Sequence, residues 1–67
     1  MEGWICVYTS NKPHEIEYLK VLLEENSIKA VEVNKLDSAY LFGDIELYVS
    51  AENAFNAKQL ISSLESE

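Results

Sequence analysis

Hydrophobic and polar positions follow one another along this chain in an order that predicts strand, helix, strand, strand, helix. Residues 4–9 combine aromatic and β-branched side chains, which is typical of a strand. Residues 13–26 and 51–64 repeat apolar side chains at helical spacing. Val31 and Val33 within residues 28–34, and Ile45, Leu47 and Val49 within residues 44–50, alternate with other residues, which predicts two further strands.

Short polar residues mark where each predicted helix begins. Ser10 or Asn11 stands before Pro13, and Ser50 stands before the second helix. Such side chains can cap the free N–H groups of a first turn, and proline is tolerated there. The Thr9–Lys12 turn could also hold an anion, but capping is the favoured interpretation.

The order of elements predicts a single α+β domain over residues 1–67. A split βαβ unit places the third strand between the first and the second, which gives a three-stranded antiparallel sheet in the order 1-3-2. Both helices would cover one face. This is a ferredoxin-like β-α-β-β-α arrangement without its last strand, and it leaves residues 4–9 at an open edge of the sheet.

The alternation along the strands predicts which residues lie on each face of the sheet. The helix-covered face is expected to carry the aliphatic residues Ile5, Val7, Val31, Val33, Ile45, Leu47 and Val49. The opposite face would carry Trp4, Cys6, Tyr8 and Tyr48, near Glu32, Asn34 and Glu46. A solvated sheet face is normally polar, and exposed apolar patches often mark interaction surfaces. We therefore predict that this face and the open edge bind a partner or a second copy.

Two further apolar features allow alternative interpretations. The loop at residues 35–43 is long for a hairpin and contains Tyr40, Leu41 and Phe42. These side chains either pack beneath the sheet or contact a partner, and the sequence favours neither. Phe55 lies roughly 160° from the apolar stripe of its helix, so a surface position or packing against the loop is expected.

Charge and size narrow the range of partners. The formal net charge is −7, there is no arginine, and the five lysines are scattered, so nucleic acid and anionic membranes are poor partners. The sequence shows neither a membrane span nor a secretory signal, and the expected location is the cytoplasm. A domain this small has a limited core, so its stability can depend on oligomerisation.

Catalytic, metal-binding and cofactor-binding signals are weak. His14 is the single histidine, and no nucleophile or orienting partner accompanies it. Cys6 is the single cysteine, which excludes an internal disulfide, and its apolar neighbours indicate a structural thiol. Glycine occurs only at Gly3 and Gly43, which leaves no phosphate-binding glycine loop. We expect a protein that is not an enzyme and that has no cofactor or metal.

Several segments in order resemble one small prokaryotic family. Residues 7–9 with 13–24 are similar to its first half, residues 28–34 to its second strand, and residues 43–49 followed by Glu52 and Ala57 to its ending. The family is described as "putative signal transducing" proteins and is related to the PII (GlnB-like) fold. The resemblance implies a ferredoxin-like fold and a signalling or regulatory role with no established reaction. In PII proteins the loop after the second strand contacts partners, and its equivalent would be Lys35–Gly43.

Two functions follow from these observations. The leading hypothesis is a non-enzymatic regulatory or protein-interaction module that acts through the edge strand and the open face. The alternative is a small-ligand sensor of PII type for a nucleotide or an anion.

Overall fold

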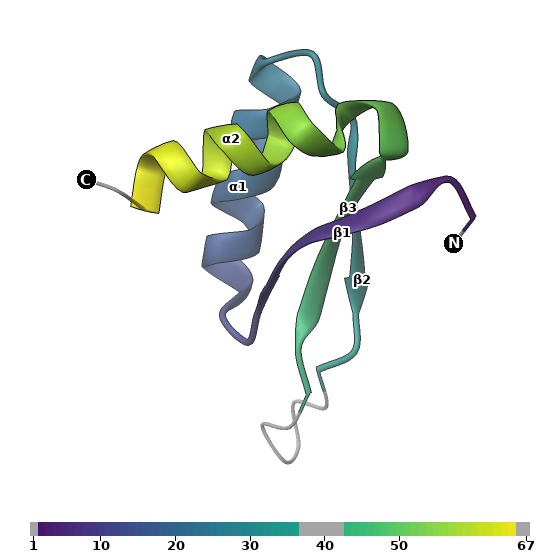
Figure 1. Ribbon diagram of the computed structural model, residues 1–67. Coiled ribbons are helices and arrows are strands. Elements are labelled where there is room, and N and C mark those ends of the chain that lie inside the picture. Colours follow the sequence, from purple (N-terminus) through teal and green to yellow (C-terminus); the bar gives the residue numbers. More distant parts are fainter. Residues whose placement is uncertain (1, 37–42, 66–67) are drawn as a thin grey trace.

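The order of elements in the structure is the predicted one. The computed structural model in Figure 1 describes residues 2–36 and 43–65, with side chains up to residue 64. Its elements are the strands β1 (Trp4–Ser10), β2 (Ala30–Asn34) and β3 (Ile45–Ser50), the helices α1 (Pro13–Glu25) and α2 (Ala54–Glu65), and a 3-10 turn, η1 (Ala51–Asn53). The predicted α+β class is confirmed.

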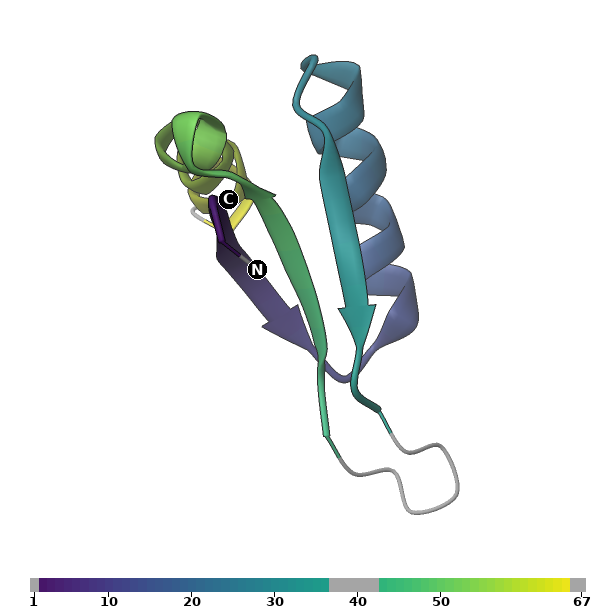
Figure 2. The same ribbon diagram turned by 90° about the vertical axis from the view of Figure 1, so that its right-hand side faces the viewer.

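The sheet has three antiparallel strands in the order β1-β3-β2, as predicted. β3 is the central strand, so in the described part of the chain β1 and β2 each have a neighbour on one side only. Figure 2 shows the three strands with α1 running beside β2 and α2 near the end of β3. The sheet therefore presents two edges, not one.

The core lies between the sheet and the two helices. Ile45, Leu47 and Val49 of β3 are at most 1% exposed, because alternate residues of the central strand all face the helices. The helices add apolar side chains at helical spacing. The remaining members of the core cluster are Ile16, Leu19, Leu23, Ile28, Ala30, Ala57 and Ile61.

The predicted faces of β2 are reversed. Residues directly opposite one another in an antiparallel pair point to the same face, and Val31 lies opposite Tyr48 while Val33 lies opposite Glu46. The prediction that both valines face the helices is therefore wrong. The small Ala30, which is 4% exposed, faces the helices instead. Glu32 points the same way and reaches Lys20 of α1 at 3.8 Å.

A β-bulge at Val7 reverses the face of the residues that follow it. Cys6 pairs with Tyr48 and Tyr8 with Leu47, so Val7 is the extra residue on β1. Tyr8 thus points to the helix side, where Val7 and Tyr8 both pack against the core. The prediction that Tyr8 shares the open face with Trp4 and Cys6 is wrong, because strict alternation does not continue through a bulge.

The helix starts differ in detail from the expected caps. Lys12 occupies the cap position of α1 and makes no side-chain cap hydrogen bond. Ser10 instead accepts from the Lys12 backbone N–H at 3.0 Å and donates to Glu15 at 2.7 Å. Ser50 stands at the cap of η1, as expected, but without a cap hydrogen bond, and its hydroxyl accepts from Asn53 at 3.2 Å.

Gly43 closes the base of the β2–β3 connection. Its φ is +94°, and an added Cβ would collide with the backbone carbonyl of Lys35. The Lys35 N–H donates to the Asp44 carbonyl at 3.0 Å just beside it. Glycine is therefore required here both for backbone conformation and for space.

Candidate interaction surface

One face of the sheet carries no helix in the described structure, and we call it the open face. Its residues follow from the register with β3 and from the alternation along each strand. All except the exposed Thr9 are half-buried. The open face consists of Trp4, Cys6 and Thr9 from β1, Glu46, Tyr48 and Ser50 from β3, and Val31 and Val33 from β2.

The charges on the open face neutralise one another. Lys35 Nζ lies 3.1 Å from Glu46 Oε1, and the Tyr48 hydroxyl donates to the same oxygen at 2.9 Å. Hydrogen bonds from Lys35 and then from Tyr48 hold the pKa of Glu46 below its ordinary value of 4.5. The hydrogen bond to Glu46 raises the pKa of Tyr48 above 10.0 and that of Lys35 above 10.5. In a chain of net charge −7, the open face is thus a locally neutral, aromatic surface.

The two edges of the sheet differ in how well they are protected against pairing with another strand. Edge strands are blunted by short length, inward-pointing charges, lysine and proline. β2 has only five residues, it points Glu32 toward the helices, and Lys29 and Lys35 flank it. β1 has seven residues without a charge or a proline, and its Ile5 is 38% exposed. Among these features, the described part of β1 has only the bulge at Val7, so β1 is the edge more open to pairing.

The predicted site residues fall into three groups. The register places Trp4, Cys6 and Tyr48 together on the open face, as expected. Tyr8 is on the helix side, as described above. The loop residues Tyr40, Leu41 and Phe42 lie outside the described residues. Cys6 is half-buried, and its thiol donates to the Tyr8 carbonyl at 3.5 Å.

Tyr8 contributes instead to a small apolar pocket of about 190 Å³ between the helices. Glu15 is one of its lining residues, and a hydrogen bond from Ser10 holds the pKa of this carboxyl below 4.5. Tyr18, 59% exposed, stands at the surface. The pocket is lined by Tyr8, Glu15, Tyr18, Leu19, Ile61 and Leu64.

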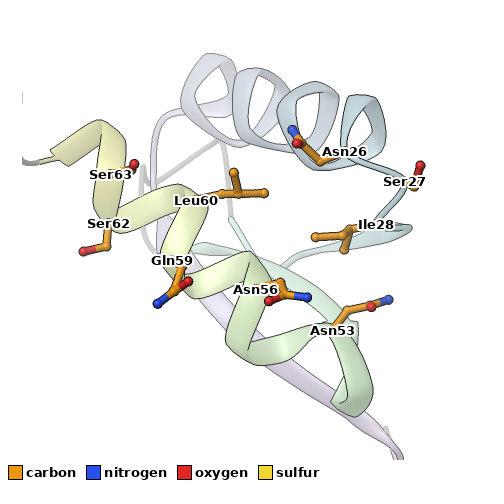
Figure 3. A pocket seen from close by; sticks show the side chains of 9 residues that line it. All are labelled: Asn26, Ser27, Ile28, Asn53, Asn56, Gln59, Leu60, Ser62 and Ser63. Carbon is orange, nitrogen blue, oxygen red and sulfur yellow. The ribbon is translucent and has the colours of Figure 1, made fainter.

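Sequence reasoning missed a second hollow, a groove of about 750 Å³ between α2 and the turn after α1. Figure 3 shows its side chains, with Leu60 of α2 and Ile28 pointing toward one another. We call it the amide groove, because four of its lining residues carry side-chain amides. The lining is Asn26, Ser27, Ile28, Asn53, Asn56, Gln59, Leu60, Ser62 and Ser63. The sequence pattern that could have indicated this groove is the occurrence of Asn53, Asn56 and Gln59 at every third position.

The remaining candidates lie apart from these surfaces. His14 is exposed in the first turn of α1, and Phe55 is 70% exposed on α2, which agrees with the expected surface position. Among the described residues, no three His, Cys, Asp or Glu side chains are grouped so that they could hold a metal ion. Over the same residues, no helix has the length and apolar character needed to cross a bilayer.

Comparison with known proteins places the chain in a family. No curated protein and no solved structure matched it. A family model described as "putative prokaryotic signal transducing protein" matches residues 4–65, which is almost the whole chain. The matched region includes the three strands, α1 and α2, in the order that the sequence patterns predicted. The chain therefore belongs to the family described as "putative prokaryotic signal transducing protein".

Proposed function

We propose that this domain is a non-enzymatic regulatory module that binds another polypeptide through the β1 edge and the open face. The observation that carries the proposal is β1 itself. It is an uncharged seven-residue edge strand beside a neutral aromatic face. An extended segment of a partner can add to such an edge through main-chain hydrogen bonds, while side chains on the face provide specificity.

The open face supports the same binding mode. Trp4 and Tyr48 are half-buried, and residues of these types dominate the energetic centres of protein interfaces. Glu46 is already paired with Lys35, so covering the face does not strand an unpaired charge. The family's signalling description agrees with a module that works by binding. The proposed location is the cytoplasm, and the proposed partner is a protein or a second copy of the chain.

The alternative, a small-ligand sensor of PII type for a nucleotide or an anion, receives less support from the structure. The turn that could have held an anion is engaged internally, because Ser10 bonds both the Lys12 N–H and the Glu15 carboxylate. A carboxylate at the start of α1 also repels an anion. The interaction module is therefore the function that the geometry supports best.

The test combines edge variants with a matched surface control. Ile5→Lys and Thr9→Lys place a charge on the β1 edge, whereas Val21→Lys makes the same kind of change at a 47% exposed position on α1. Light scattering measures self-association, and affinity capture with mass spectrometry identifies partners. We expect the wild type and Val21→Lys to bind alike. Both β1 variants should bind at least about tenfold more weakly, because binding would bury the added charge without a partner.

Hydrogen exchange on the captured complex locates the contact. Binding at β1 should slow the exchange of backbone amides in residues 4–10, because these groups gain hydrogen-bond partners. Trp4 is the single tryptophan, so its fluorescence reports whether the open face is covered. A complex that forms equally well with both β1 variants, with unchanged exchange in β1, would show that the proposal is wrong.

A further inference from the structure

The amide groove differs in chemistry from the rest of the surface. Lysine and acidic residues make up 5 and 12 of the 67 positions, yet none of the residues lining the groove is charged. The lining contains amides from Asn26, Asn53, Asn56 and Gln59, three serine hydroxyls, and two aliphatic residues. A ligand in this groove therefore meets neutral hydrogen-bonding groups around an apolar strip.

The amides of η1 and α2 are regularly spaced. Asn53 in η1 and Asn56 and Gln59 in α2 follow at every third residue, and all three line the groove (Figure 3). Side chains three apart have Cβ atoms about 5–6 Å from each other. An extended peptide presents backbone groups toward the same side at every second residue, or about every 6.6 Å. Asparagine and glutamine side chains are long enough to make up the difference between these two spacings. The spacing of the amides therefore matches the repeat of an extended backbone.

The groove offers unused hydrogen-bonding capacity. Within the described part of the chain, the side chains of the exposed Asn56 and Gln59 have no hydrogen-bond partner. The side-chain amide of Asn26 donates to the Leu22 carbonyl at 2.8 Å, and the side-chain amide of Asn53 donates to the Ser50 hydroxyl. Each of these two amides still presents a carbonyl oxygen as an acceptor. Donors and acceptors therefore both remain available along the groove.

We propose that the amide groove binds a short, extended, uncharged peptide segment that has one aliphatic side chain. A side-chain amide has one acceptor and two donors, which match the C=O and N–H of a peptide backbone. The aliphatic side chain would lie over Leu60, which is half-buried, and Ile28, which is 5% exposed. These two residues lie between the two walls of the groove. Asn53 to Ser63 spans about 15 Å of helix, the length of four or five extended residues.

Other ligand classes fit the lining less well. A phosphate or carboxylate would find no lysine among the lining residues. A nucleobase would find no aromatic ring to stack on in that lining. The proposal is independent of the β1 edge, because the groove uses η1, α2 and the turn after α1. A failure here therefore leaves the proposed function untouched.

The experiment is a titration of the isotope-labelled full chain followed by NMR. The probe is a pool of N-acetylated, C-amidated tetrapeptides built from alanine, leucine, valine, serine and glutamine. We expect the side-chain NH₂ signals of Asn56 and Gln59 and the backbone signals of Ile28 and Leu60 to shift. The double variant N56D/Q59E, which replaces NH₂ donors with carboxylate oxygens, should weaken binding about tenfold or more.

Asn11→Asp provides the control, because it adds one negative charge of the same kind at an exposed position outside the groove. It should bind the pool within about twofold of the wild type, given that exposed distant charges are largely screened. Shifts confined to β1, or no shifts at millimolar peptide, would overturn the proposal. An equal response to the neutral sugar maltotetraose would also overturn it, because the groove would then not select a peptide. The chemical-shift changes of the wild-type chain test the proposal even if N56D/Q59E does not fold.

Discussion

At the scale of single residues, Glu46 links the charge state of the open face to pH. Its pKa is lower in the folded chain than its ordinary 4.5, so its contribution to stability is present above about pH 4.5. That contribution is lost as pH falls through the folded pKa. The pKa values of Tyr48 and Lys35 are raised above 10.0 and 10.5, so their contributions are present below about pH 10. They are lost as pH rises through the folded values.

We therefore predict that this network contributes a constant amount of stability between about pH 5 and pH 10, with a loss on each side. Urea unfolding followed by circular dichroism across this range measures it. Tyr48→Phe should weaken the alkaline decline, because it removes a phenol whose neutral form the fold favours. Tyr18→Phe, which removes an exposed phenol on α1, is the control and should leave the decline unchanged. An identical alkaline decline in Tyr48→Phe and the wild type would contradict the described network.

The sequence could identify Trp4, Cys6 and Tyr48 as neighbours but could not identify their polar contacts. All three positions follow from alternation, which is a property of the backbone. The Lys35–Glu46 ion pair depends on where the chain turns after β2, which alternation does not determine. The amide groove was missed for a related reason. Its walls come from segments far apart in the sequence, and the every-third spacing of three amides does not show that the turn after α1 lies opposite them.

At the scale of elements, the existence and order of the helices and strands were predictable. The side of the sheet on which each strand residue lies was not always predictable. The helices and strands follow from long periodic patterns, and their observed bounds differ by only a few residues from those expected. The face of Tyr8 depended on a bulge that adds one residue opposite β3. The faces of β2 depended on Ala30, because a small buried residue is a weaker hydrophobic signal than the half-buried Val31 and Val33.

Two identical substitutions test the corrected faces. Val49 is fully buried beneath the helices, and Val49→Ala should cost about 2–3 kcal/mol through lost burial and a cavity. Val31 is half-buried on the open face, and Val31→Ala should cost less than about 1 kcal/mol. Urea denaturation of both variants measures the difference. Equal losses would mean that Val31 faces the core after all.

At the scale of the whole molecule, excess negative charge opposes the compact state. The formal net charge is −7 and the Cα radius of gyration is 11.9 Å, so many carboxylates lie within a short distance of one another. Ion pairs offset this repulsion at Lys12–Glu15, Lys20–Glu32 and Lys35–Glu46. Exposed pairs contribute little, because solvent screens them and the side chains lose freedom. The net repulsion should therefore dominate the response to salt.

We predict that sodium chloride stabilises this domain at pH 7. Raising the ionic strength from about 0.01 to 0.1 M shortens the Debye length from about 30 to 10 Å, which should raise the free energy of unfolding by about 1 kcal/mol. Urea titrations at the two salt concentrations measure the change, and urea is required because guanidinium is itself a salt. The control is the same comparison near pH 4.5, the isoelectric point, where the gain should disappear. Stability that falls with salt at pH 7 would mean that the ion pairs outweigh the repulsion. The acidic composition would then destabilise the fold less than its net charge indicates.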